Sequence, residues 1–108
     1  MGYGRGFGGG GNMQQLMKQA QQMQRKLQEA QEQIAETEVT GSAAGGMVEF
    51  TMMADKTPVS ISIKPEAVDP DDVEMLEDMI LAAINDANAQ ADKVQKDLMG
   101  PFGNAGLF

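Results

Sequence analysis

Four cationic side chains near the start of the chain are the residues best suited to bind an anion. Arg5, Lys18, Arg25 and Lys26 lie within the first 27 residues, which contain no acidic residue and carry a formal charge of +4. The other 81 residues contain 4 basic and 16 acidic residues, and the whole chain carries -8. Binding to DNA requires cations that displace the counterions condensed on its phosphates. The uneven charge therefore favours phosphate contact at the N-terminal end of the chain only.

The spacing of these cations predicts a common face on a helix. At about 100° per residue, Lys18 and Arg25 lie within about 20° of each other, and Lys26 is adjacent in sequence. Side chains so placed can reach phosphates together, although a solvated helix face with no binding role has the same pattern. Arg5 stands among glycines, as in arginine–glycine segments that contact nucleic acid flexibly. An inert glycine-rich tail is the alternative for Arg5.

Other chemistries lack their usual residues. The chain has no Cys and no His, so it offers no thiolate nucleophile, imidazole base or soft metal ligand. The carboxylates from Asp69 to Glu74 surround Pro70 and fit a helix start better than a calcium loop, which requires a central glycine. The glycines from Gly4 to Gly9 match G-x-G-x-x-G, but no strand precedes them. We therefore expect no enzyme, no cofactor, no metal and no small-molecule substrate.

The elements expected to position the cations begin with a long helix. Residues 1–11 are mostly glycine and are predicted to be disordered, and Asn12 can cap the helix that follows. The helix is predicted to run to about Glu36. Its apolar or small residues recur at alternating spacings of three and four, which is the pattern of a heptad seam, at Met13, Leu16, Ala20, Met23, Leu27, Ala30 and Ile34.

Three strands and a second helix are expected next. Residues 37–40, 48–52 and 59–63 alternate or are rich in β-branched residues, and turns at Gly45-Gly46 and 54–58 join them into an antiparallel meander. Asp69 and Pro70 predict the start of a second helix, which Gly100-Pro101 should end. The prediction is an α+β fold with one α-β-β-β-α domain over 12–100 and a flexible tail over 101–108.

Assembly and location follow from size and composition. A domain of 108 residues buries a small core, and a long helical arm would leave its apolar face wet unless a second subunit covered it, so a homodimer is expected. The ten Met residues are expected to fill the core or that interface. No apolar run approaches the ~20 residues that span a bilayer. With no disulfide possible, the chain is expected to be cytosolic, with no membrane partner.

Several strings in this order resemble the YbaB/EbfC family of bacterial nucleoid-associated proteins. The resemblance spans nearly the whole chain and is carried by residues 17–24 (MKQAQQMQ), Val39-Thr40-Gly41, Ile63-Lys64-Pro65 and residues 76–87 (LEDMILAAINDA). It implies a tweezer-like homodimer, paired through its sheets, whose projecting helices bind duplex DNA with little or modest sequence preference. It also implies a location in the cytoplasm with the nucleoid and a role in nucleoid organisation or gene expression.

A second hypothesis remains open on the residues alone. The heptad seam and the Met-rich faces could capture another protein's helix, and the acidic bulk of the chain would then exclude nucleic acid. Under this alternative the chain is a protein-interaction module without direct DNA binding.

Overall fold

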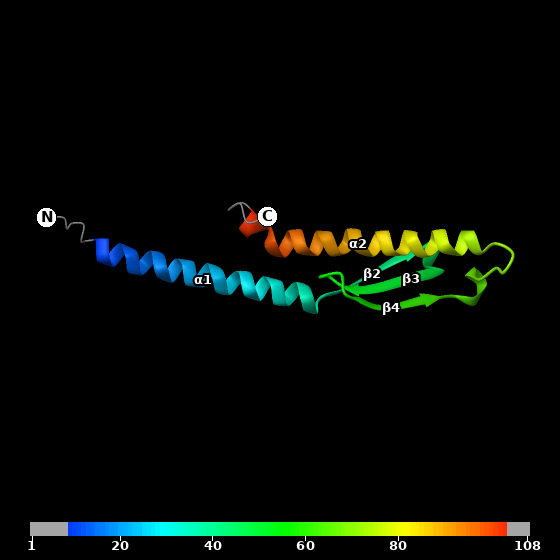
Figure 1. The fold of residues 1–108 in the computed structure, drawn as a ribbon, viewed down its shortest axis with the longest axis horizontal. Helices are drawn as coiled ribbons and strands as arrows, with labels where there is room; N and C mark the ends of the chain where they lie inside the picture. The colour runs from blue at the N-terminus through cyan, green and yellow to red at the C-terminus, as the bar shows by residue number, and fades with distance from the viewer. Residues whose placement is uncertain (1–8, 104–108) are drawn as a thin grey trace.

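The computed structural model describes residues 9–103, and the surroundings of side chains for residues 12–100. A long helix, α1 (Gly9–Glu36), leads into a three-stranded sheet, and a second long helix, α2 (Val73–Gly103), returns along the sheet to the side of α1 (Figure 1). The principal extents are 85 × 19 × 16 Å. The molecule therefore has a body, formed by the sheet and α2, and an arm formed by the N-terminal part of α1.

The sheet is the predicted antiparallel meander. Its strands are β2 (Glu38–Ala43), β3 (Val48–Met53) and β4 (Pro58–Ile63), in the order β2-β3-β4. A short 3-10 turn (Ala44–Gly46) joins the first two strands, and Gly45 and Gly46 take φ values of 66° and 93° there. Left-handed backbone of this kind costs glycine nothing, which explains the glycine pair at this turn.

The second hairpin uses an aspartate. The Asp55 carboxylate accepts a hydrogen bond from the Thr57 backbone N–H at 2.9 Å, and Lys56 takes a positive φ of 74°. Hydrogen bonding from the Thr57 hydroxyl and from its backbone N–H holds the pKa of Asp55 below its usual value of 3.8. A side chain that bonds the backbone two residues on stabilises a turn without glycine.

The two faces of the sheet differ in chemistry. One face is polar, and the hydroxyls of Thr40 and Thr51 lie 3.0 Å apart on it. The other face carries Val39 and Met52, which are buried against Ala87 and Ala91 of α2. The alternation of strand side chains therefore directs the apolar residues of β2 and β3 toward α2.

Helix α2 approaches the sheet unusually closely at Gly41. A Cβ built on Gly41 would lie 2.2 Å from the Ala83 carbonyl oxygen and 2.3 Å from the Ala87 nitrogen. Ala83 and Ala87 are themselves fully buried. Beside this contact, the Asp86 carboxylate accepts a hydrogen bond from the Ser42 N–H at 2.9 Å. The small residues of β2 and α2 at this point thus allow the backbone of the strand to contact the backbone of the helix.

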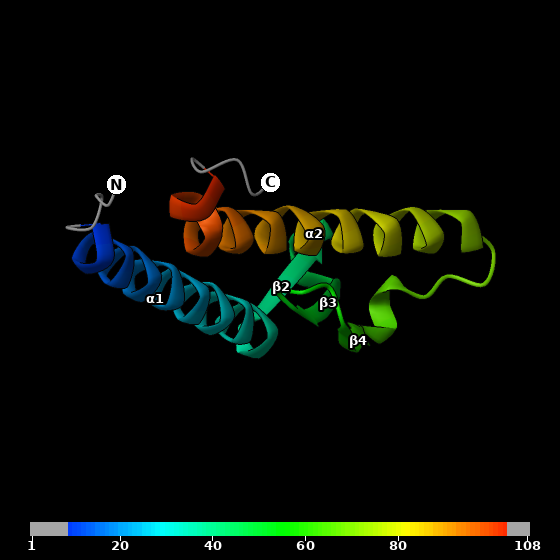
Figure 2. The ribbon, with the colours of Figure 1, turned by 60° about the vertical axis from the view of Figure 1, so that its left-hand side comes forward.

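Both predicted ends of the second helix are wrong. The helix begins at Val73, because the Asp69 carboxylate accepts from the Asp71 N–H at 2.9 Å and closes a turn, while Asp72 caps the helix through the Met75 N–H at 3.2 Å. It continues to Gly103 because Gly100 does not adopt the positive φ by which glycine ends a helix. The final turn instead leaves the helix axis (Figure 2), as expected near a proline.

Helix α1 ends at Glu36 as predicted but begins at Gly9, so Asn12 lies inside it and does not cap it. Glycine has no steric bar to helical dihedral angles, which allows the extra turn. The predicted disorder of 1–11 and flexibility of 101–108 concern segments that lie mostly outside the described residues.

The apolar seam of α1 is covered along only part of its length. Ala30 and Ile34 are buried in a cluster with Ala54 and Met99, against which Leu27 packs. Farther toward the N-terminus the seam is open, with Met13, Leu16 and Met23 exposed by 63%, 62% and 49%. The expectation that methionines fill the core or a dimer interface is confirmed in the core for Met52 and Met99. For the exposed methionines of α1, which α2 does not cover, a place in an interface stays a prediction.

Candidate nucleic-acid interface

Lys18 and Arg25 form a basic ridge along the arm. Both side chains are exposed on α1, seven residues apart. Seven residues are about two helical turns, so the two cations lie about 10 Å apart along the axis and nearly on one line. The exposed side chain of Lys26 lies on the flank between this basic ridge and the apolar seam. The structure therefore presents the three predicted cations of the arm to solvent.

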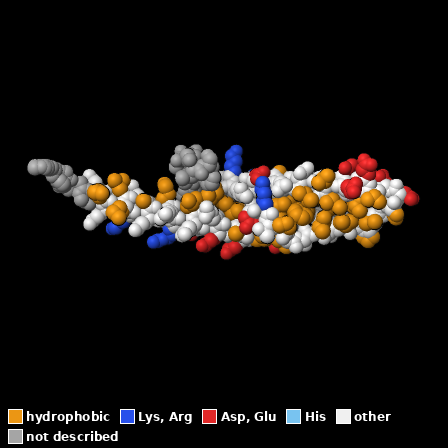
Figure 3. Space-filling view, in the orientation of Figure 1, with side chains coloured by type: hydrophobic (Ala, Val, Ile, Leu, Met, Phe, Trp, Pro, Cys, Tyr) orange, Lys and Arg blue, Asp and Glu red, His pale blue; other side chains and the backbone are white. Residues whose placement is uncertain are grey.

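The charge on this face changes sign toward the body. Glu29, Glu32 and Glu36 are exposed and follow the basic ridge on the same side of α1 by helical spacing. Figure 3 shows the basic side chains of the arm followed, nearer the body, by acidic ones. A polyanion attracted to the arm would be repelled at its base.

The basic ridge is not neutralised by ion pairing within the residues described. There, the one salt bridge joins Lys56 Nζ to Asp92 Oδ1 at 2.7 Å, in the body. Lys93 and Lys96 are also exposed on α2, but each has an aspartate four residues away, at Asp97 and Asp92 respectively. Both lysines of α2 therefore have acids within one helical turn, whereas on the arm Lys18 has none and Arg25 and Lys26 have only Glu29.

Arg5 lies outside the described residues, so the structure does not place it relative to the basic ridge. Its predicted contribution to DNA contact stays a prediction.

An apolar patch that the sequence did not reveal lies on the body. Val59 and Ile61 of β4 are 50% and 47% exposed, and Leu81 of α2 is 58% exposed. Gln95 donates from Nε2 to the Ala54 carbonyl just beyond β3, which shows that this flank of α2 faces the β3–β4 side of the sheet. Figure 3 shows apolar side chains gathered over the body between α2 and the strands. We call Val59, Ile61 and Leu81 the body patch.

The apolar side of β4 is therefore left in solvent in the single chain. Ile61 pairs with Phe50 across the hairpin and shares its side of the sheet, but α2 lies over β2 and β3 and leaves β4 uncovered. The alternation of Val59 and Ile61 with serines was the available signal. Only the lateral position of α2 shows that these side chains are left in solvent.

Among the residues that the structure describes, no helix is long and apolar enough to traverse a bilayer, and no group of three or more Asp, Glu, His or Cys side chains is placed to hold a metal ion.

The chain folds as a helix, an antiparallel meander and a second helix, and its cationic arm lies apart from its acidic body. These features define a class of small α+β proteins with a projecting helix. The model of the YbaB/EbfC DNA-binding family matches residues 9–107 of the chain. The chain belongs to this family.

Curated relatives agree with the family match. A nucleoid-associated protein of Saccharopolyspora erythraea is 48% identical over 98 residues, covering 91% of this chain and 84% of the relative. A nucleoid-associated protein of Chloroflexus aurantiacus is 50% identical over 99 residues, covering 90% of this chain and 99% of the relative. These relatives take their names from the nucleoid and not from a reaction.

A solved structure shares the fold. The crystal structure of an uncharacterized protein from Helicobacter pylori aligns with a TM-score of 0.69 at 21% identity, covering 82% of this chain and 94% of the other. At this identity the likeness supports the arrangement of helices and sheet alone.

Proposed function

We propose that the protein is a nucleoid-associated protein that binds duplex DNA as a homodimer with low or modest sequence preference. The observation that carries the proposal is the basic ridge, whose exposed Lys18 and Arg25 lie on an arm with no acid before Glu29. Lys26, on the flank of the arm, and Arg5 complete the proposed contact set. Association with the nucleoid of a bacterial cytoplasm and an effect on nucleoid organisation or gene expression belong to the same proposal and are supported by the names of the relatives.

Low sequence preference follows from the chemistry of the arm. Lysine and arginine on the outside of a helix reach phosphates, which are the same at every base pair. Phosphate contacts fix position and supply affinity but carry no sequence information directly.

The dimer is proposed to form through the body patch. Large apolar side chains such as Ile61 and Leu81 are about half exposed in the single chain, and apolar side chains gather over the body (Figure 3), as expected of an interaction site. A second copy presents the same patch, so a two-fold symmetric contact would cover both at once.

The dimer contact has a direct test in Ile61→Asp. An unpaired carboxylate in an apolar interface costs several kcal/mol, so the dissociation constant should rise at least about 100-fold. We expect sedimentation at micromolar concentration to show monomers. Ser60→Asp is the matched control, because it adds the same charge one residue away on the opposite face of β4. A dimer retained in Ile61→Asp would contradict this interface.

The DNA proposal has its test in a gel shift repeated at increasing salt. If both arms of a dimer bring Lys18, Arg25 and Lys26 to phosphates, six contacts give a slope of about -5 in log K against log salt. Affinity should then fall roughly a thousandfold between about 50 mM and 200 mM salt. Failure to retard duplex DNA at the lowest salt would overturn the proposed function.

The alternative of a protein-interaction module is supported by the exposed seam of the arm, where Met13 and Leu16 lie in solvent. A pull-down at about 0.3 M salt separates the two hypotheses, because phosphate contacts weaken there whereas apolar contacts between helices persist. Retention of protein partners and loss of DNA at every salt concentration would favour the alternative.

A further inference from the structure

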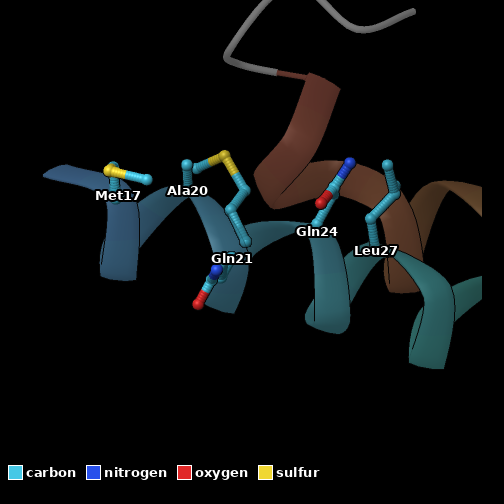
Figure 4. A pocket seen from close by; sticks show the side chains of 6 residues that line it. Met17, Ala20, Gln21, Gln24 and Leu27 are labelled. Carbon is cyan, nitrogen blue, oxygen red and sulfur yellow. The ribbon is translucent and has the colours of Figure 1, made fainter.

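The open part of the α1 seam is an apolar surface that the proposed DNA contact does not use. We call it the arm stripe. It is made of Met13, Leu16, Met17, Ala20 and Met23, all exposed, and it continues into Leu27, which α2 partly covers. A shallow open pocket runs along it, lined by Met17, Ala20, Gln21, Met23, Gln24 and Leu27. Figure 4 shows Gln24 and Leu27 projecting toward the end of α2, while Met17 lies beyond it.

We propose that the arm stripe packs against the arm stripe of a second copy and so joins two dimers arm to arm. The inference takes the dimer from the proposed function but does not depend on DNA binding.

The first argument for a second copy is the heptad spacing of the stripe. Leu16, Ala20 and Met23 continue the row that places Leu27, Ala30 and Ile34 on one side of α1. Farther along, that row already packs against Leu98 and Met99 of another helix. A row of this spacing pairs with a row of the same spacing, which an identical helix supplies.

The second argument is the charge beside the stripe. Its borders are glutamines, including Gln19 and Gln24, with Lys26 the nearest charge and no acid before Glu29. A strongly acidic or basic partner helix would find little complementary charge there. The arm stripe of a second copy is also uncharged, so pairing two arm stripes brings no charge against a surface that lacks its complement.

The third argument is the position of the basic ridge. Lys18 and Arg25 lie roughly opposite the stripe on α1, so two arms packed by their stripes turn their ridges outward on opposite sides. With helix axes about 8–10 Å apart, the cations of the two ridges are separated by on the order of 20 Å or more, beyond the Debye length of about 8 Å. Arm pairing therefore leaves both ridges free, and the joined dimers present two separate surfaces to DNA.

The body patch does not compete for the stripe. Figure 1 places the tip of α1 at one end of the long axis and the strands at the other. A dimer formed through Ile61 and Leu81 accordingly leaves the arm stripe available for a second dimer.

Cysteine cross-linking tests the contact, and the chain contains no native Cys to interfere. Leu16→Cys, Ala20→Cys and Met23→Cys are oxidised singly, with Gln14→Cys as the matched control. Gln14 is also exposed, but it lies about 160° around the helix from Leu16. We expect at least one stripe position to form a disulfide more than about ten times faster than Gln14→Cys, in a species that sediments as a tetramer. No such excess, or a cross-linked species that remains a dimer, would overturn the proposal.

A neutral variant separates assembly from DNA binding. Leu16→Gln combined with Met23→Gln keeps the helix propensity and charge of α1 but removes two large apolar side chains from the stripe. We expect sedimentation at about 100 μM to change from tetramer to dimer, while the affinity of the dimer for a short duplex changes by less than about twofold. Wild-type protein that is never larger than a dimer would overturn arm pairing and leave the proposed DNA binding standing.

Discussion

Reversing the charge of Lys18 and Arg25 together is expected to abolish retardation of duplex DNA. The double variant Lys18→Glu, Arg25→Glu replaces the basic ridge of each arm with carboxylates that phosphates repel. Four lost contacts per dimer should make the salt slope shallower by about 4. At about 0.1 M salt, affinity should fall on the order of 100-fold to 1,000-fold.

A control variant must separate the effect of where the charges are reversed from the effect of the change in net charge. Lys93→Glu, Lys96→Glu changes the formal charge by the same amount but places it on α2, where acids already surround both lysines. We expect it to bind DNA within a few-fold of wild type. Gel filtration should show that both variants keep the dimer, because none of the four residues belongs to the body patch. Equal losses in the two variants would contradict the arm as the DNA surface.

The second large effect is expected at Gly41. In Gly41→Ala the new Cβ would meet three backbone atoms of α2, namely the Ala83 oxygen at 2.2 Å, the Ala87 nitrogen at 2.3 Å and the Ala87 Cα at 2.8 Å. Backbone cannot move aside as the end of a flexible side chain can, so α2 must lift from β2. We expect a cost of about 3 kcal/mol or more, at or beyond the upper end for overpacking, and a Tm lower by more than about 10 °C.

Gly100→Ala provides the matched control for this substitution. A Cβ at Gly100 would meet nothing within 4 Å, and the residue lies inside α2. Alanine there should stabilise the helix by up to about 1 kcal/mol through its better propensity. Thermal unfolding of both variants at one protein concentration makes the comparison, since the stability of a dimer depends on concentration. A Gly41→Ala protein as stable as wild type would show that the close approach of α2 is not required.

The helices and the meander were predictable because their signals are local. Alternation along β3 and β4, the glycine pair at Gly45-Gly46 and the heptad spacing of α1 each depend on neighbours a few residues away. The first and last residues of α2 were less predictable. Asp69, Pro70 and Asp72 all favour a helix start, and which aspartate caps the helix depends on the turn that the chain makes before Val73.

The candidate site was likewise predictable from the sequence only in part. The cationic residues of the arm could be named from sequence, since charge sign and helical spacing place Lys18 beside Arg25 without any tertiary contact. The body patch could not be named, because Val59 and Ile61 have the pattern of a strand that a helix covers. Val39-Thr40-Gly41 was recognisable as a family string, but the string did not show what Gly41 contacts.

The sequence by itself determined where charge lies along the chain, which segments form helices and strands, and which side of each element is apolar. The tertiary structure decided which apolar sides are covered. Helix α2 lies over β2 and β3, reaches only the C-terminal part of the α1 seam, and leaves β4 and the arm stripe in solvent. Periodicity is a property of neighbouring residues, whereas coverage depends on contacts between residues far apart in sequence, such as Gly41 with Ala83 and Ile34 with Met99.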